Sequence, residues 1–78
     1  MPHVEIKCFV GRTEEQKHIC ADRVADVIAE TLGCNKSSVS VAIKGIPEDE
    51  WKTEVWDKNI VPDAGVLYKK PGYSCDED

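Results

Sequence analysis

Apolar and polar side chains alternate along the first ten residues of the chain. The even-numbered positions after the proline are apolar: Val4, Ile6, Cys8 and Val10. The odd-numbered positions are mostly polar: His3, Glu5, Lys7 and Phe9. Because successive side chains of a strand point to opposite faces, residues 2–10 are predicted to form a strand with one buried and one partly exposed face. Gly11 is expected to end this strand.

After Gly11 the apolar period changes from two residues to three or four. Thr13 and Gln16 have the spacing of a capping box, in which each side chain accepts a hydrogen bond from the backbone amide of the other. The apolar positions that follow, interrupted by Arg23, are Ile19, Cys20, Val24, Val27, Ile28, Thr31 and Leu32. This spacing predicts a helix of about 20 residues with one apolar stripe. Gly33 is the expected left-handed C-cap.

A second alternating segment, SSVSVAIK, covers residues 37–44 and is predicted to form a strand that ends at Gly45. A long helix between two strands predicts a right-handed β-α-β unit with parallel strands. Two strands and one helix do not make a stable sheet. We therefore expect an obligate homo-oligomer, in which two copies of the chain form a four-stranded sheet.

Residues 46–78 are less regular and are expected to form a short C-terminal extension of an α+β fold. Pro47–Trp51 is typical of a first helical turn, and the helix is expected to continue toward Ile60. Lys69–Tyr73 is predicted to be a turn with an aromatic anchor. With 78 residues, the chain is expected to form a single domain over residues 1–78.

Composition narrows the classes of partner. Apolar residues make up 41% and charged residues 32%, which argues against both a disordered chain and a membrane protein. No apolar run is long enough for a transmembrane helix or a signal peptide, so we expect a cytoplasmic protein. The net charge of −5 argues against nucleic acid as a partner.

The four cysteines are spread along the chain without a C-x-x-C pair. They are Cys8, Cys20, Cys34 and Cys75. Free, mostly buried thiols are favoured over zinc ligands or disulfides, and no metal site is expected. A thiol or metal protein is kept as the third functional hypothesis. Since a chain this short buries a small core, the additional stability is expected to come from oligomerisation.

Two residues near the start of the chain could carry chemistry. Pro2 directly follows Met1, and removal of Met1 would convert its nitrogen into a free secondary amine, which is a base. Arg12 directly precedes the predicted helix, where the helix dipole is already positive, so the cation disfavours stability but suits a bound anion. Taken alone, each is explained more simply as a strand-initial proline and a solvated turn arginine.

Other polar and aromatic residues carry less information. Trp51 and Trp56 are, taken alone, interpreted as packing anchors. His3 and His18 have no partner visible in the sequence and are interpreted as surface residues. Ser40 has no companion residues of a nucleophile arrangement and is interpreted as structural.

The combination of these features has a counterpart in a known family. The segment MPHVEIKCFVGRTEEQK resembles the start of the 4-oxalocrotonate tautomerase family, with Pro2, an alternating strand, Gly11–Thr13 and Glu15–Lys17 in the same order. The resemblance continues through SSVSVAI and Trp51. The segment LYKKPGYS is similar to a subgroup of that family with a longer C-terminal tail. The resemblance covers nearly the whole chain.

The resemblance implies a tautomerase fold and a keto–enol tautomerase without cofactor or metal. In this family the initiator methionine is lost, the Pro2 amine is the catalytic base, Arg12 binds the substrate carboxylate and Trp51 lines the substrate pocket. A second arginine of the hexameric prototype is replaced by Ser40. This replacement favours substrates with one carboxylate, such as an aryl enolpyruvate. The long C-terminus implies a homodimer, with a hexamer as the alternative.

Elementary chemistry agrees with that implication. Ketonisation moves a proton from an enol oxygen to carbon, and one base with a near-neutral pKa can take it and return it. A secondary amine is ordinarily protonated at neutral pH, but burial and a nearby cation such as Arg12 disfavour its charged form. The alternative is a non-catalytic dimeric module of the same fold that binds a small carboxylate or a protein. The missing second arginine is its best support.

Overall fold

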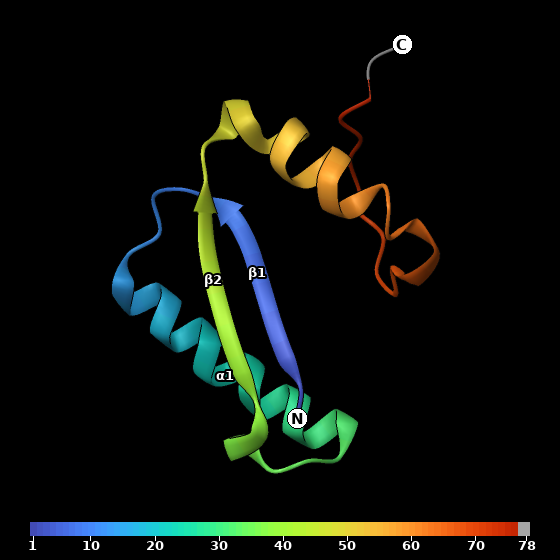
Figure 1. The fold of residues 1–78 in the computed structure, drawn as a ribbon. Coiled ribbons are helices and arrows are strands. Elements are labelled where there is room, and N and C mark those ends of the chain that lie inside the picture. The colour runs from blue at the N-terminus through green and yellow to red at the C-terminus, as the bar shows by residue number, and fades with distance from the viewer. Residues whose placement is uncertain (77–78) are drawn as a thin grey trace. The chain divides into compact units, whose positions relative to one another are not determined.

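The computed structural model describes residues 1–76, and the chain divides into two compact units. The first unit is residues 1–45, and the second begins at Ile46. The regular elements, labelled in Figure 1, are β1 (His3–Phe9), α1 (Glu14–Leu32) and β2 (Ser40–Ile46). The first unit therefore contains β1, α1 and all of β2 except its last residue.

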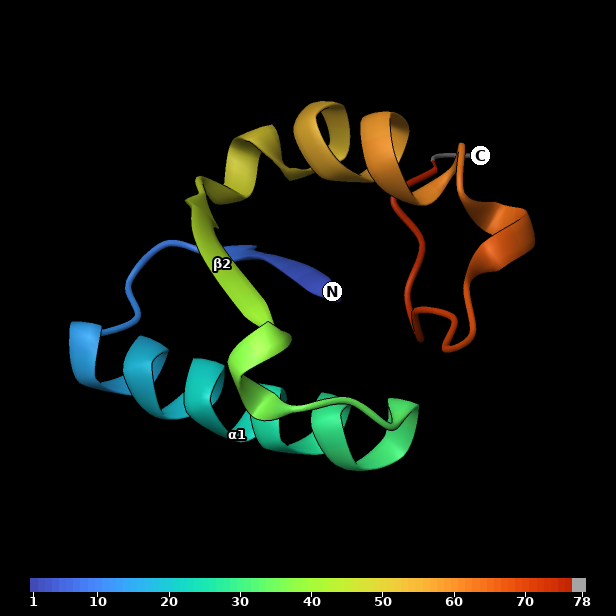
Figure 2. The same ribbon diagram turned by 60° about the horizontal axis from the view of Figure 1, so that its bottom comes forward.

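In the first unit, β1 and β2 form a two-stranded sheet and run in the same direction (Figure 1). Both views place α1 along one face of this sheet (Figure 2). The predicted parallel β-α-β unit is confirmed. The Ser40 amide donates to the Pro2 carbonyl at 3.2 Å, so Ser40 lies opposite His3 at the start of both strands.

The predicted bounds of β2 were wrong at both ends. Residues 36–38 form a 3₁₀ turn, in which the Ser38 amide donates to the Asn35 carbonyl at 2.9 Å. That amide is used locally and does not join the ladder. At the other end, the strand continues through Gly45, where an added Cβ would lie 3.1 Å from Cγ1 of Val10. The glycine therefore permits a close approach of the chain after β1 instead of ending the strand.

The ends of α1 are confirmed. The Thr13 hydroxyl accepts from the Gln16 amide at 3.1 Å, and the Gln16 side chain accepts from the Thr13 amide at 2.8 Å. Gly33 has φ 74° and donates to the Ala29 carbonyl at 3.1 Å. Both ends are thus set by contacts within a few residues of the chain.

Only part of the predicted apolar stripe of α1 is buried within one chain. The central positions that are at least half-buried are Ala21, Val24, Ala25, Ile28 and Ala29. Three of them are alanines spaced four residues apart. The predicted members that remain exposed are Ile19, Cys20, Val27, Thr31 and Leu32. Cys20, Val27 and Thr31 share one side of α1, which we call the exposed helix face.

The second unit is built around one irregular helix. A 3₁₀ turn over Glu48–Glu50 leads into a π-helix over Lys52–Ile60, so the expected short helix is confirmed. A further 3₁₀ turn covers Ala64–Val66. The Trp56 side chain is buried and its ring centroid lies 5.6 Å from that of Tyr73. The predicted aromatic anchor of the Lys69–Tyr73 turn is therefore confirmed.

Two further predictions from the sequence concern membrane-spanning helices and the cysteines. Across residues 1–76, no helix combines the length and apolar character required to cross a bilayer. All four cysteines are free. Their expected burial was wrong, because Cys20 is exposed and the other three are only half-buried.

Candidate active site

Pro2 lies at the entry to β1, immediately before its first residue. Its side chain is half-buried, whereas Met1 is fully exposed. The Pro2 carbonyl is held by the Ser40 amide. In this chain the Pro2 nitrogen is part of the peptide bond to Met1, so it becomes an amine only when Met1 is removed.

Arg12 lies at the other end of β1, in the turn that leads to α1. Gly11 has φ 112°, a value that favours glycine, and it reverses the chain between the strand and the helix. The Arg12 side chain is exposed, and its Nη1 donates to the Phe9 carbonyl at 3.4 Å. Among residues 1–76, no carboxylate forms an ion pair with Arg12. The guanidinium is therefore available to an anion.

One chain does not bring Pro2 and Arg12 together. The Arg12 guanidinium is hydrogen-bonded to the carbonyl of Phe9, at the end of β1. Phe9 lies seven residues after Pro2, and an extended strand rises roughly 3.3 Å per residue. The two groups therefore lie on the order of 20 Å apart. That separation is far longer than a small enol carboxylate.

Trp51 belongs to the second unit, at the junction of its 3₁₀ turn and π-helix. Its ring is half-buried, and its Nε1 donates to the Tyr73 hydroxyl at 3.1 Å. Tyr73 in turn packs against Trp56, whose own Nε1 donates to Asp76 at 3.0 Å. These contacts hold the Trp51 ring in one orientation within its unit, so it offers a rigid apolar surface.

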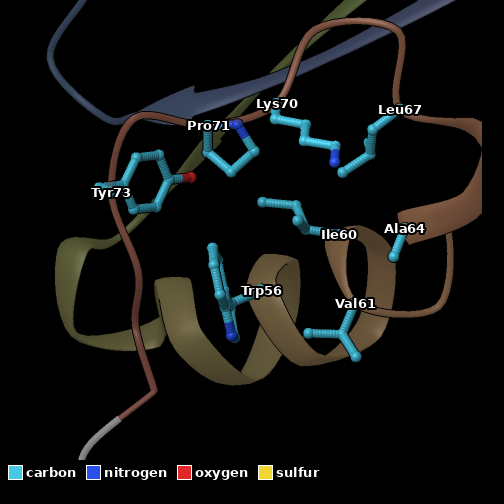
Figure 3. A pocket seen from close by; sticks show the side chains of 8 residues that line it. All are labelled: Trp56, Ile60, Val61, Ala64, Leu67, Lys70, Pro71 and Tyr73. Carbon is cyan, nitrogen blue, oxygen red and sulfur yellow. The ribbon is translucent and has the colours of Figure 1, made fainter.

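The second unit also contains a cavity of about 380 Å³, shown in Figure 3. Its walls are mainly apolar and include Trp56, Ile60, Val61, Leu67, Pro71 and Tyr73. Lys70 is the one charged side chain at its edge, and it extends toward Leu67 (Figure 3). None of the three residues singled out from the sequence lines this cavity, although Trp51 is bonded to Tyr73.

Sequence reasoning missed a contact beside Pro2. The His3 Nδ1 and the Ser40 Oγ are 2.6 Å apart, so the two side chains share a hydrogen bond whose direction depends on the histidine tautomer. Both residues were interpreted as having no chemical partner. The two residues are 37 positions apart, and their pairing depends on the strand register. The available signal was the parallel pairing of the two strand starts.

A second polar pair occupies the same face of the sheet. The Lys44 Nζ lies 2.7 Å from a carboxylate oxygen of Glu5. The hydrogen bond from Lys44, aided by its charge, lowers the pKa of the Glu5 carboxyl below its usual value. Because both side chains are well exposed, this pair contributes little to stability.

Within residues 1–76, no three His, Cys, Asp or Glu side chains gather closely enough to hold a metal ion. The first unit therefore offers an amine after loss of Met1 and a guanidinium without a carboxylate partner among residues 1–76, and the second unit offers an indole ring bonded to Tyr73.

Residues 2–56 match the family model described as "Tautomerase enzyme". Two curated relatives carry the name Tautomerase PptA. The protein from Enterobacter sp. (strain 638) is 47% identical over 75 residues, covering 95% of this chain and 99% of the relative. The protein from Cronobacter sakazakii (strain ATCC BAA-894) is 42% identical, covering 94% of this chain and 97% of the relative.

A solved structure is similar in both sequence and fold. It is the crystal structure of YwhB, described as a homologue of 4-oxalocrotonate tautomerase. The TM-score is 0.59 and the sequence identity is 33%. The match covers 62% of this chain and 79% of YwhB.

Proposed function

The chain belongs to the tautomerase family of isomerases, and on this premise we propose that it ketonises a small enol carboxylate without a cofactor. The proposed substrate class is the aryl enolpyruvates, which carry one carboxylate. The observation that carries the proposal is the position of Pro2 at the entry to β1, behind a fully exposed Met1. Met1 in this position is accessible to an aminopeptidase.

The proposed base is the Pro2 amine of the mature chain. The neutral amine takes the proton of the enol hydroxyl, which leaves an enolate and a protonated amine. The carbonyl then forms as the enolate carbon takes the proton back, and the amine is regenerated. The cycle is balanced in protons and electrons, so it requires no oxidant or reductant.

Arg12 is the proposed group for the substrate carboxylate. Its guanidinium is exposed and has no carboxylate partner among residues 1–76. It can hold a carboxylate through two parallel hydrogen bonds and can stabilise the charge that develops on the enolate oxygen. Trp51 is proposed as an apolar substrate contact, because its ring is half-buried and held by Tyr73.

We further propose that the protein acts as a homodimer and that Arg12 of the partner subunit completes the site around Pro2. The length of β1 supports this, because one substrate cannot span Pro2 and Arg12 of the same chain. The exposed helix face and the two-stranded sheet support association, since both leave surfaces that a second copy can cover. In this arrangement the dimer contains a four-stranded sheet.

The catalytic proposal is tested by replacing the base. Pro2→Ala is expected to lower kcat for phenylenolpyruvate ketonisation about 100-fold, because the mature chain then ends in a primary amine without the ring that directs the base, and a misplaced base slows the proton transfer. The mass of the mature protein is measured in parallel, and the expected mass lacks Met1. A Pro2→Ala enzyme with wild-type activity would contradict the assignment. Retention of Met1 in the cellular protein would favour the non-catalytic binding module.

Sharing of the site between subunits has its own test. Pro2→Ala and Arg12→Ala chains are purified separately, unfolded together and refolded as a mixture. In a mixed dimer one of the two sites combines an intact Pro2 with an intact Arg12 of the partner subunit. Random pairing therefore restores about a quarter of wild-type activity. If each site used Pro2 and Arg12 of the same chain, the mixture would stay as inactive as its components.

A further inference from the structure

Ser40 makes two contacts at the start of β1. Its amide donates to the Pro2 carbonyl at 3.2 Å, and its Oγ is 2.6 Å from the Nδ1 of His3. One residue of β2 therefore holds both the residue proposed as the base and the residue that follows it.

The geometry of a terminal proline gives these contacts a consequence. Once Met1 is removed, the Pro2 ring is joined to the protein through its Cα–C bond alone. The direction of its amine is then set by one torsion and by the peptide group between Pro2 and His3. The Ser40 amide holds the carbonyl of that peptide group. The Ser40 hydroxyl holds the imidazole of His3, the residue that follows the same peptide group.

Without these contacts, the first residues of the strand would fray as chain termini do. We infer that His3 and Ser40 act as positioning residues, which form a clamp that orients the Pro2 amine toward its substrate. The inference rests on the proposed function of Pro2. Neither residue is proposed to touch the substrate, and the clamp acts through Pro2.

The same face of the sheet provides a matched comparison. Glu5 and Lys44 join the same two strands through a side-chain contact of 2.7 Å, but further from Pro2. His3, Ser40, Glu5 and Lys44 are all exposed. If side-chain pairs on this face only stabilised the sheet, breaking either pair would have a similar effect. A clamp on Pro2 predicts an effect of the first pair alone.

The test measures kcat and KM for phenylenolpyruvate in variants of the mature enzyme. Ser40→Ala keeps the backbone contact to Pro2 but removes the side-chain contact to His3. It is expected to lower kcat about tenfold with KM within about twofold, because a misdirected base slows the proton transfer more than it weakens binding. Ser40→Thr keeps a hydroxyl on a strand position and is expected to retain most of the activity. His3→Phe, which keeps a ring but loses Nδ1, is expected to behave like Ser40→Ala.

Glu5→Gln and Lys44→Met are the matched controls and are expected to leave kcat within about twofold of wild type. A second measurement does not depend on activity. The ¹⁵N order parameters of the His3 and Val4 amides are expected to fall in Ser40→Ala and to stay unchanged in Lys44→Met.

The outcomes separate this inference from the proposed function. If Pro2→Ala is inactive while Ser40→Ala keeps the wild-type kcat, the clamp is wrong and the base assignment stands. If Lys44→Met lowers kcat as much as Ser40→Ala, the effect is general loosening of the sheet and the clamp is again wrong. If Pro2→Ala remains active, the proposed function fails. Unchanged order parameters at His3 and Val4 in Ser40→Ala would then overturn the clamp as well.

Discussion

The two units of the chain differ in how much regular secondary structure they contain and in which side chains they bury. The first unit has both strands and the long helix, yet Ala25 is the one buried apolar residue among residues 1–45. The second unit has no strand of its own beyond the last residue of β2, and its helix has the irregular π form. It nevertheless buries Val55 and Trp56.

The difference shows that regular secondary structure does not by itself produce a core. The first unit pairs its backbone groups within the helix and the sheet but leaves apolar side chains such as Val27 at 55% exposure. The second unit instead gathers its turns around Trp56, which packs on Tyr73 and donates to Asp76. In the proposed dimer a second copy covers the first unit, whereas the second unit packs around its own Trp56.

The largest expected effect is on the second unit. Trp56→Ala removes the ring at its centre and is expected to cost about 3–5 kcal/mol of unfolding free energy, because a large buried side chain leaves a cavity. Urea denaturation followed by circular dichroism measures the change. Tyr68→Ala is the control, since that ring is fully exposed and its loss should leave stability unchanged. Equal losses in the two variants would refute the central role of Trp56.

The next effect concerns the proposed dimer. Val27→Lys puts a charge on the exposed helix face and is expected to raise the dimer dissociation constant at least about tenfold, because it removes apolar burial between the copies. Sedimentation over a range of concentrations measures it. Glu30→Gln makes the same change of net charge on an exposed position of α1 and should leave the constant unchanged. If the wild-type protein were a monomer, the proposed dimer would be wrong, and with it the contrast drawn between the two units.

A smaller effect is expected at the start of α1. Thr13→Ala breaks the capping box and is expected to cost about 1 kcal/mol, because the Gln16 amide loses its acceptor. Thr13→Ser keeps the hydroxyl and should restore the loss. Thermal unfolding of both variants provides the measurement. If Thr13→Ser were as unstable as Thr13→Ala, the hydrogen bond would not be the cause.

The smallest effect is a pH dependence in the first unit. Lys44 lowers the pKa of Glu5 in the folded state, so this contribution to stability is complete above the ordinary pKa of a glutamate. It is lost as the pH falls through the lowered pKa, where Glu5 is protonated in both states. Glu5→Gln should therefore be slightly less stable than wild type at neutral pH and equal to it in acid. A difference that grew in acid would contradict this sign.

The fold was largely predictable because its signals are local. Alternation placed β1, and the reciprocal bonds of Thr13 and Gln16 placed the start of α1. The apolar stripe did not show which side of α1 is buried within one chain, because Ala21, Ala25 and Ala29 lie outside it. The expectation of a single domain over residues 1–78 stays a prediction, as do the roles of Pro2, Arg12 and Trp51.

What the sequence determined by itself is the order of the main elements and both ends of α1, because capping and alternation depend on residues that are near neighbours in the chain. Only the tertiary structure decided which residues that are distant in the chain lie together. The strand register brought His3 against Ser40 across 37 positions, and the stiffness of an extended strand kept Pro2 and Arg12 apart. Contacts between distant residues depend on how whole elements pack, and no local pattern specifies that packing.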